Sequence, residues 1–124
     1  MVSINQELAR QITELAETAL EGLEHVQRQN MEGKFEQTMP LFTDVIEAFT
    51  EIEKILALNG LLDNPEDALA SSTQSLKDGF DWMTKAYEQR DNINPLDTMD
   101  LTLLPRYKKW QEDLHECLRS YLSS

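Results

Sequence analysis

The sequence has very few of the residues that build disulfide scaffolds, metal centres and long loops. Its 124 residues include one cysteine, Cys117, two histidines, four glycines and four prolines. A lone cysteine cannot form an internal disulfide or a zinc site made of several thiolates. So few glycines and prolines leave little chain for irregular loops. These absences exclude a disulfide scaffold and a cysteine zinc finger, and they favour a reducing compartment.

Basic residues are also scarce relative to acidic ones. Eleven lysines and arginines stand against 23 aspartates and glutamates, which gives a net charge of −12. Such a charge repels phosphate backbones and anionic lipid heads, so we expect no nucleic-acid partner and no membrane partner. No apolar run approaches the roughly 18 residues of a membrane span, and Glu7 and Arg10 interrupt the beginning of the chain before a signal-peptide core could form. We therefore expect a cytoplasmic protein.

The sequence is rich in hydrophobic residues that repeat with helical periodicity. It is 40% hydrophobic and 27% charged, which is typical of a globular protein, and its length predicts a single domain over residues 1–124. Apolar stripes with three- and four-residue spacing predict amphipathic helices, so we expect at least three-quarters helix and no sheet. The four predicted helices span residues 4–30, 35–58, 65–87 and 97–121.

Capping residues and prolines set the expected ends and bends of these helices. Ser3 opens a capping box before the first helix, and Asn64 followed by Pro65 is typical of a helix N-terminus. Pro40 and Pro105 fall inside stripes that hold their phase on both sides. Because proline removes one backbone hydrogen bond, we expect continuous helices that can kink at these two positions.

A weak internal duplication underlies the four helices. When the first predicted helix is aligned with the third, Gly22 falls on Gly79, and when the second is aligned with the fourth, Pro40 falls on Pro105. Glycine inside a helix costs roughly 1 kcal/mol relative to alanine, so two equivalent glycines indicate close helix packing. Chance matching of amphipathic helices is the alternative. The pattern predicts an all-α fold, an antiparallel four-helix bundle made of two similar helix hairpins.

One spacing is typical of a metal-binding helix. Glu112 and His115 form a Glu-x-x-His pair, which carboxylate-bridged di-metal bundles use. At about 100° per residue both side chains point away from the apolar stripe that contains Trp110, and a second such pair is missing. His25, four residues after Glu21, lies at the edge of its stripe. We therefore predict no catalytic, cofactor-binding or metal-binding residue; the less favoured alternative is a carboxylate and histidine metal bundle or enzyme.

Cys117 occupies a central position in the last apolar stripe. A free cysteine at such a position usually behaves as a small buried hydrophobe. Burial raises the pKa of a thiol and lowers its reactivity. The spacing therefore predicts a buried, slowly reacting Cys117 rather than a redox centre.

Some apolar residues are left over once each helix has been given one buried stripe. A second stripe lies beside the first on helices 35–58 and 97–121, Trp82 lies at the rim of its stripe, and Leu101 lies on the opposite side of its helix from Trp110. A bundle needs only about 100° of apolar face from each helix, so a protein partner or a second copy in a homodimer is expected to cover the surplus. The candidate interaction residues are Leu41, Ile55, Trp82, Leu104, Leu118 and Leu122.

These patterns predict a non-enzymatic protein-interaction module, an acidic adaptor or scaffold that binds a protein partner or pairs with itself as a dimer. In size, negative charge and helical hairpins the chain also resembles the flagellar secretion chaperones. That resemblance implies an alternative function, a small export or assembly chaperone that holds an amphipathic partner segment.

Overall fold

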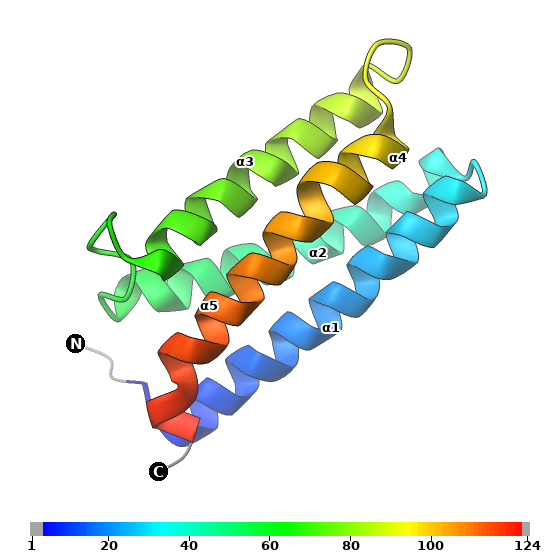
Figure 1. The fold of residues 1–124 in the computed structure, drawn as a ribbon. Coiled ribbons are helices and arrows are strands. Elements are labelled where there is room, and N and C mark those ends of the chain that lie inside the picture. The colour runs from blue at the N-terminus through cyan, green and yellow to red at the C-terminus, as the bar shows by residue number, and fades with distance from the viewer. Residues whose placement is uncertain (1–3, 123–124) are drawn as a thin grey trace.

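The computed structural model describes residues 4–122, and every regular element among them is a helix. Consecutive long helical segments run in opposite directions along one bundle (Figure 1). The predicted all-helical fold with four long helices is confirmed, and helices cover more than three-quarters of the chain. The elements are α1 (Gln6–Met31), α2 (Phe35–Leu58), α3 (Ala68–Glu88), and a fourth segment made of α4 (Pro95–Thr98), the π-helix η1 (Met99–Leu103) and α5 (Leu104–Leu122).

Each long helix packs against two neighbours around a shared core. Helix α1 lies beside α2 and α5, and α3 lies beside α5 and α2 (Figure 1). Aromatic rings fill the space between α2 and α3, where the ring centroids of Phe42 and Phe49 lie 6.0 Å and 5.2 Å from that of Phe80. The ring centroid of Trp110 on α5 lies 5.2 Å from that of Phe49. Because these rings are large, α2 and α3 stay farther apart than α1 and α2 do.

The two interior glycines allow close helix packing, as their equivalent positions predict. A Cβ atom added at Gly22 would lie 3.1 Å from the Cγ2 of Val45 and 3.8 Å from the Cδ1 of Leu41, both on α2. A Cβ atom at Gly79 would lie 3.2 Å from the Cδ of Arg106 on α5. The alignment of the two hairpins that superimposes Pro40 on Pro105 also superimposes Leu41 on Arg106. Equivalent positions therefore meet in both hairpins, which supports the duplication.

The two prolines inside helices are accommodated differently. Pro40 lies within α2, which continues through it as an α-helix. Before Pro105 the backbone forms the π-helix η1, in which the Leu104 N–H donates to the carbonyl of Met99. In a regular α-helix the Pro105 ring would clash with the carbonyl four residues earlier, that of Leu101. A wider π-turn directly before the proline is one way in which a helix adapts to such a ring.

Two helix starts differ from the sequence-based predictions. The side chain of Asn5 caps α1 by accepting a hydrogen bond from the Leu8 N–H at 2.8 Å, and Ser3 lies outside the described residues. The fourth segment begins at Pro95, capped by Asn94, two residues before the predicted start near residue 97. Proline at the first position of this segment needs no N–H partner there, which explains the earlier start.

The predicted start of α3 at Pro65 is wrong. The side chain of Asn64 accepts a hydrogen bond from the Glu66 N–H at 3.0 Å and closes a turn instead of capping a helix. The helix begins three residues later, at Ala68, and Asp67 precedes it. Asparagine before proline fits a turn as well as a helix cap, so the dipeptide alone does not separate the two.

A buried hydrogen-bond cluster joins three helices at one end of the bundle. Asn30 of α1, Thr38 of α2 and Tyr87 of α3 are all buried. The Asn30 Nδ2 donates to the Tyr87 hydroxyl at 2.8 Å, and the Thr38 hydroxyl lies 3.3 Å from the Asn30 Oδ1. Burial raises the pKa of the Tyr87 hydroxyl, so it stays neutral. The cluster satisfies polar groups that would otherwise be buried without partners.

We expect Tyr87→Phe to lower the free energy of unfolding by about 1–2 kcal/mol, because Asn30 loses a buried partner. Urea denaturation followed by circular dichroism measures this loss. The double variant Asn30→Leu/Tyr87→Phe removes both polar groups and should lose less than the sum of the two single variants. Strict additivity would show that the two side chains do not interact.

Candidate interaction surfaces

Two of the six candidate interaction residues belong to the core. Leu104 is 7% exposed and Leu118 is 0% exposed, so neither is part of a surface, and the prediction of a leftover stripe there is wrong. Helix α5 packs against both α1 and α3, which buries a wider face than a single stripe. The buried face passes through Leu114 and Leu118, whereas Cys117 and Tyr121 are only half-buried.

The other four candidate residues differ in exposure. Leu41, Ile55 and Leu122 are half-buried and pack against the core. Trp82 of α3 is 45% exposed. Of the six residues, Trp82 therefore offers the most exposed apolar side chain to a partner.

The residues weighed as metal ligands lie at the surface. Glu112, His115 and His25 are all exposed. The His25 Nδ1 lies 3.4 Å from the Arg28 Nη2 on the same helix. Within residues 4–122 no three His, Cys, Asp or Glu side chains are placed to hold a metal ion together.

Cys117 is half-buried rather than fully buried as predicted. Burial, followed by the negative charge of Asp67, raises the pKa of its thiol. The reactive thiolate is therefore scarcer at neutral pH than in a free thiol. We expect Cys117 in the native protein to react more slowly with a disulfide reagent than glutathione does, and to react faster in denaturant. If native Cys117 reacted as fast as glutathione, its thiol would be neither shielded by burial nor raised in pKa, and this description of Cys117 would be wrong.

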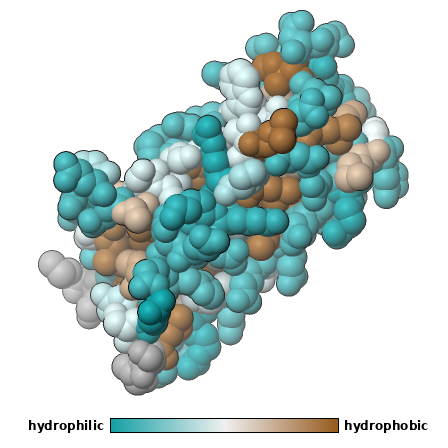
Figure 2. All heavy atoms as spheres, viewed as in Figure 1, coloured by the Kyte–Doolittle hydropathy of each residue, from teal (hydrophilic) through white to brown (hydrophobic). Residues whose placement is uncertain are grey.

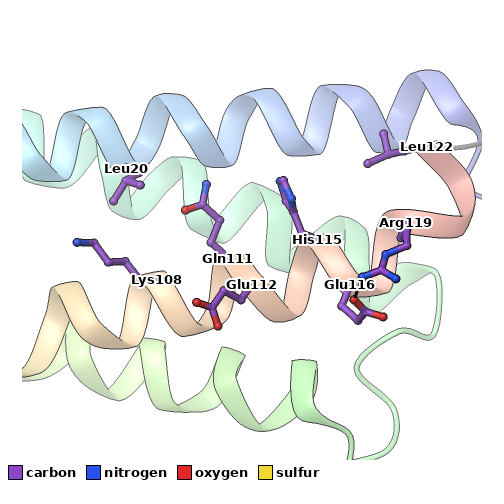
Figure 3. Close-up of a pocket in the computed structure, with 8 residues that line it drawn as sticks. All are labelled: Leu20, Lys108, Gln111, Glu112, His115, Glu116, Arg119 and Leu122. Carbon is purple, nitrogen blue, oxygen red and sulfur yellow. Dashed lines mark hydrogen bonds and ion pairs between the residues drawn. The ribbon is translucent and has the colours of Figure 1, made fainter.

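An open groove of about 810 Å³ runs between α1 and α5. In Figure 3, Leu20, Gln111, His115 and Leu122 project into the space between the two helices. Its remaining lining residues are charged: Lys108, Glu112, Glu116 and Arg119. Leu20 and Leu122 are half-buried against the core, so neither side chain is as exposed as Trp82 of α3. Two basic and two acidic residues give the groove no preference for one sign of charge.

Two exposed apolar side chains lie on elements that pack against each other, η1 and α3. Leu101 of η1 is 77% exposed, and Trp82 of α3 is 45% exposed. A Cβ atom at Gly79 would lie 3.4 Å from the Cδ1 of Leu103. Trp82 follows Gly79 by three residues and Leu101 precedes Leu103 by two, so both lie within about one helical turn of this contact. We call these two side chains the Trp82–Leu101 surface.

Hydrophobic atoms are visible at the solvent surface over the α4 and η1 end of the bundle (Figure 2). Sequence reasoning placed Leu101 opposite the core but did not select it as a candidate interaction residue. The signal was its position across the helix from Trp110, on the side that faces solvent. An isolated exposed leucine carries little information, but Leu101 and the exposed Trp82 lie on neighbouring elements at the same level of the bundle, which makes them a candidate binding surface.

Comparisons with known proteins add a family to this description. No helix among the described residues is long and apolar enough to cross a membrane. A search of curated proteins found no match, and a search of solved structures found none either. A family model described as a domain of unknown function (DUF8042) matches residues 7–113, which is well over half of the chain. The chain therefore belongs to the DUF8042 family.

Proposed function

We propose that this protein is a non-enzymatic protein-interaction module, an adaptor or scaffold that binds a partner through the Trp82–Leu101 surface. One observation supports this most directly: of the five large apolar side chains exposed among the described residues, Trp82 and Leu101 lie on elements that pack against each other, α3 and η1. Leaving such a side chain in water forgoes roughly 1.5–3 kcal/mol of burial. Tryptophan is also the residue type most enriched among energetically dominant interface contacts. A partner that covers both side chains would recover that burial.

We also propose that this protein is located in the cytoplasm. Its single cysteine is free, and the pKa of that thiol is raised, which suits a compartment where thiols stay reduced. The net charge of −12 opposes self-association and directs the protein toward basic partners.

The proposal is tested by comparing matched variants in an extract of the source organism. Tagged wild-type protein, Leu101→Asp and Leu58→Asp are incubated with extract, crosslinked and analysed by mass spectrometry. Leu58 is 67% exposed at the end of α2, so its variant controls for a charge added at any exposed leucine. We expect Leu101→Asp, but not Leu58→Asp, to lose partners that wild type captures. Equal capture by all three proteins would overturn the proposal.

A further inference from the structure

The two exposed side chains of the Trp82–Leu101 surface share one local sequence pattern. Trp82 is preceded by Asp81 and, four residues earlier, by Asp78. Leu101 has the same arrangement, with Asp100 directly before it and Asp97 four residues earlier. Asp78 lies about one turn before Trp82 within α3, and Asp97 lies about one turn before Leu101 along the fourth segment, so each apolar side chain has carboxylates within about one helical turn. All four aspartates are exposed.

The negative charge of these aspartates is not cancelled within the bundle. Asp78 accepts a hydrogen bond from Gln74 at 3.0 Å and Asp100 accepts one from Gln27 at 2.6 Å, and both donors are neutral amides. The ion pairs formed among residues 4–122 involve none of the four aspartates. The surface therefore combines two apolar anchors with four negative charges.

Nearby basic residues reduce this negative charge but do not reverse it. Lys77 pairs with Glu53 of α2 at 3.0 Å, and Arg106 donates to the backbone carbonyl of Ser75 at 2.9 Å. Lys85, three residues after Trp82, is the remaining base close in sequence. Arg106 keeps its positive charge when it donates to a neutral carbonyl, so Arg106 and Lys85 together oppose the four aspartates, and the rim stays negative on balance.

We infer that the partner segment of this surface is a basic amphipathic helix. Its apolar face would cover Trp82 and Leu101, and its lysines or arginines would lie beside the four aspartates. This inference rests on the proposed function and adds the chemistry of the partner to it. A second copy of the chain is disfavoured as the occupant, because a symmetric pairing through this surface would bring like-charged rims together.

Three synthetic peptides provide the test by isothermal titration calorimetry against the intact protein. The first is a short helix of leucines and lysines, four turns long, with leucines at three- and four-residue spacing. The second replaces each lysine by glutamate, and the third has the composition of the first in an order without an apolar face. We expect the first peptide alone to bind measurably, with an affinity that falls as salt rises. Equal binding of the second or third peptide would overturn the inference.

Matched variants locate the binding on the molecule. Leu101→Asp and Trp82→Ala should each weaken binding of the first peptide by roughly tenfold, whereas Leu58→Asp should not. Leu101→Asp adds a negative charge, so nonspecific attraction alone would strengthen rather than weaken binding of a basic peptide. Asp78→Asn/Asp97→Asn should weaken binding by a smaller factor that disappears at high salt. An equal loss in Leu58→Asp would contradict this site.

The outcomes separate this inference from the proposed function. If Leu101→Asp loses its captured partners but the basic peptide binds no better than the acidic one, the surface is an interaction site and the partner is not basic. If Leu101→Asp retains every partner, the proposed function itself fails. Sedimentation of the wild-type protein as a dimer that Leu101→Asp dissociates would identify a second copy as the occupant and overturn the inference.

Discussion

Leu118→Glu is expected to unfold the protein. Leu118 is 0% exposed in the core of α5, so the substitution removes a buried leucine and buries a carboxylate in its place. Each effect costs several kcal/mol, and an uncompensated buried charge alone costs about 3–5 kcal/mol. The total approaches the free energy of unfolding of a typical domain, which is roughly 5–15 kcal/mol. Circular dichroism at room temperature should show loss of most of the helical signal.

Leu101→Glu provides the matched control within the same helical segment. Leu101 is 77% exposed, so the same change of residue places the carboxylate in water. We expect it to change the free energy of unfolding by less than about 0.5 kcal/mol. If the Leu118→Glu protein stays folded and loses only its binding to a partner or to a second copy, Leu118 lies on the surface. That result would contradict the burial of Leu118 in the core.

Trp110→Ala is expected to lower the free energy of unfolding by about 3–5 kcal/mol. Trp110 is 0% exposed, and its ring centroid lies 5.2 Å from that of Phe49 and 5.3 Å from that of Tyr107. Its indole N–H donates to the Thr73 hydroxyl oxygen at 3.1 Å. The substitution leaves a large cavity at the point where α2, α3 and α5 meet. Urea denaturation followed by circular dichroism measures the loss.

Two further variants separate the contributions to this loss. Trp110→Phe keeps an aromatic ring and removes the indole N–H, while the Thr73 hydroxyl retains its hydrogen bond to the Leu69 carbonyl at 2.6 Å. We therefore expect the lost hydrogen bond to lower the free energy of unfolding by only about 1 kcal/mol. The smaller ring adds a separate loss of packing. Trp82→Ala should lower the free energy of unfolding by much less than Trp110→Ala, because Trp82 is 45% exposed and Trp110 is 0% exposed. Equal losses in Trp82→Ala and Trp110→Ala would contradict the assignment of one tryptophan to the surface and one to the core.

Much of the fold is predictable because hydrophobic periodicity records which side of each helix is buried. Phe42, Phe49 and Ile52 of α2 follow their predicted stripe into the core. Gly22 and Gly79 were predictable for a different reason, since a close helix contact explains a glycine at each equivalent position. Such features depend on residues within one helix or one hairpin, which a sequence displays directly.

The phase of the last helix was harder to predict because it depends on neighbours far away in sequence. A single stripe through Cys117 and Tyr121 assumes one packing partner, whereas α5 packs against both α1 and α3 and buries Leu118 instead. The π-turn before Pro105 adds a local change in helical phase that a regular α-helical periodicity does not contain. The candidate surface was therefore found only in part: Trp82 was selected, and Leu101 was not.

The central claim, that Trp82 and Leu101 form a partner-binding surface, is tested most directly by the solvent access of Trp82. The chain contains two tryptophans, so Trp110→Phe leaves Trp82 as the sole indole. Acrylamide quenching of its fluorescence is measured with and without the saturating leucine and lysine peptide. We predict efficient quenching in the free protein and a large decrease when the peptide is bound. Unchanged quenching in a demonstrably bound complex would contradict the claim, because the partner would then occupy another surface.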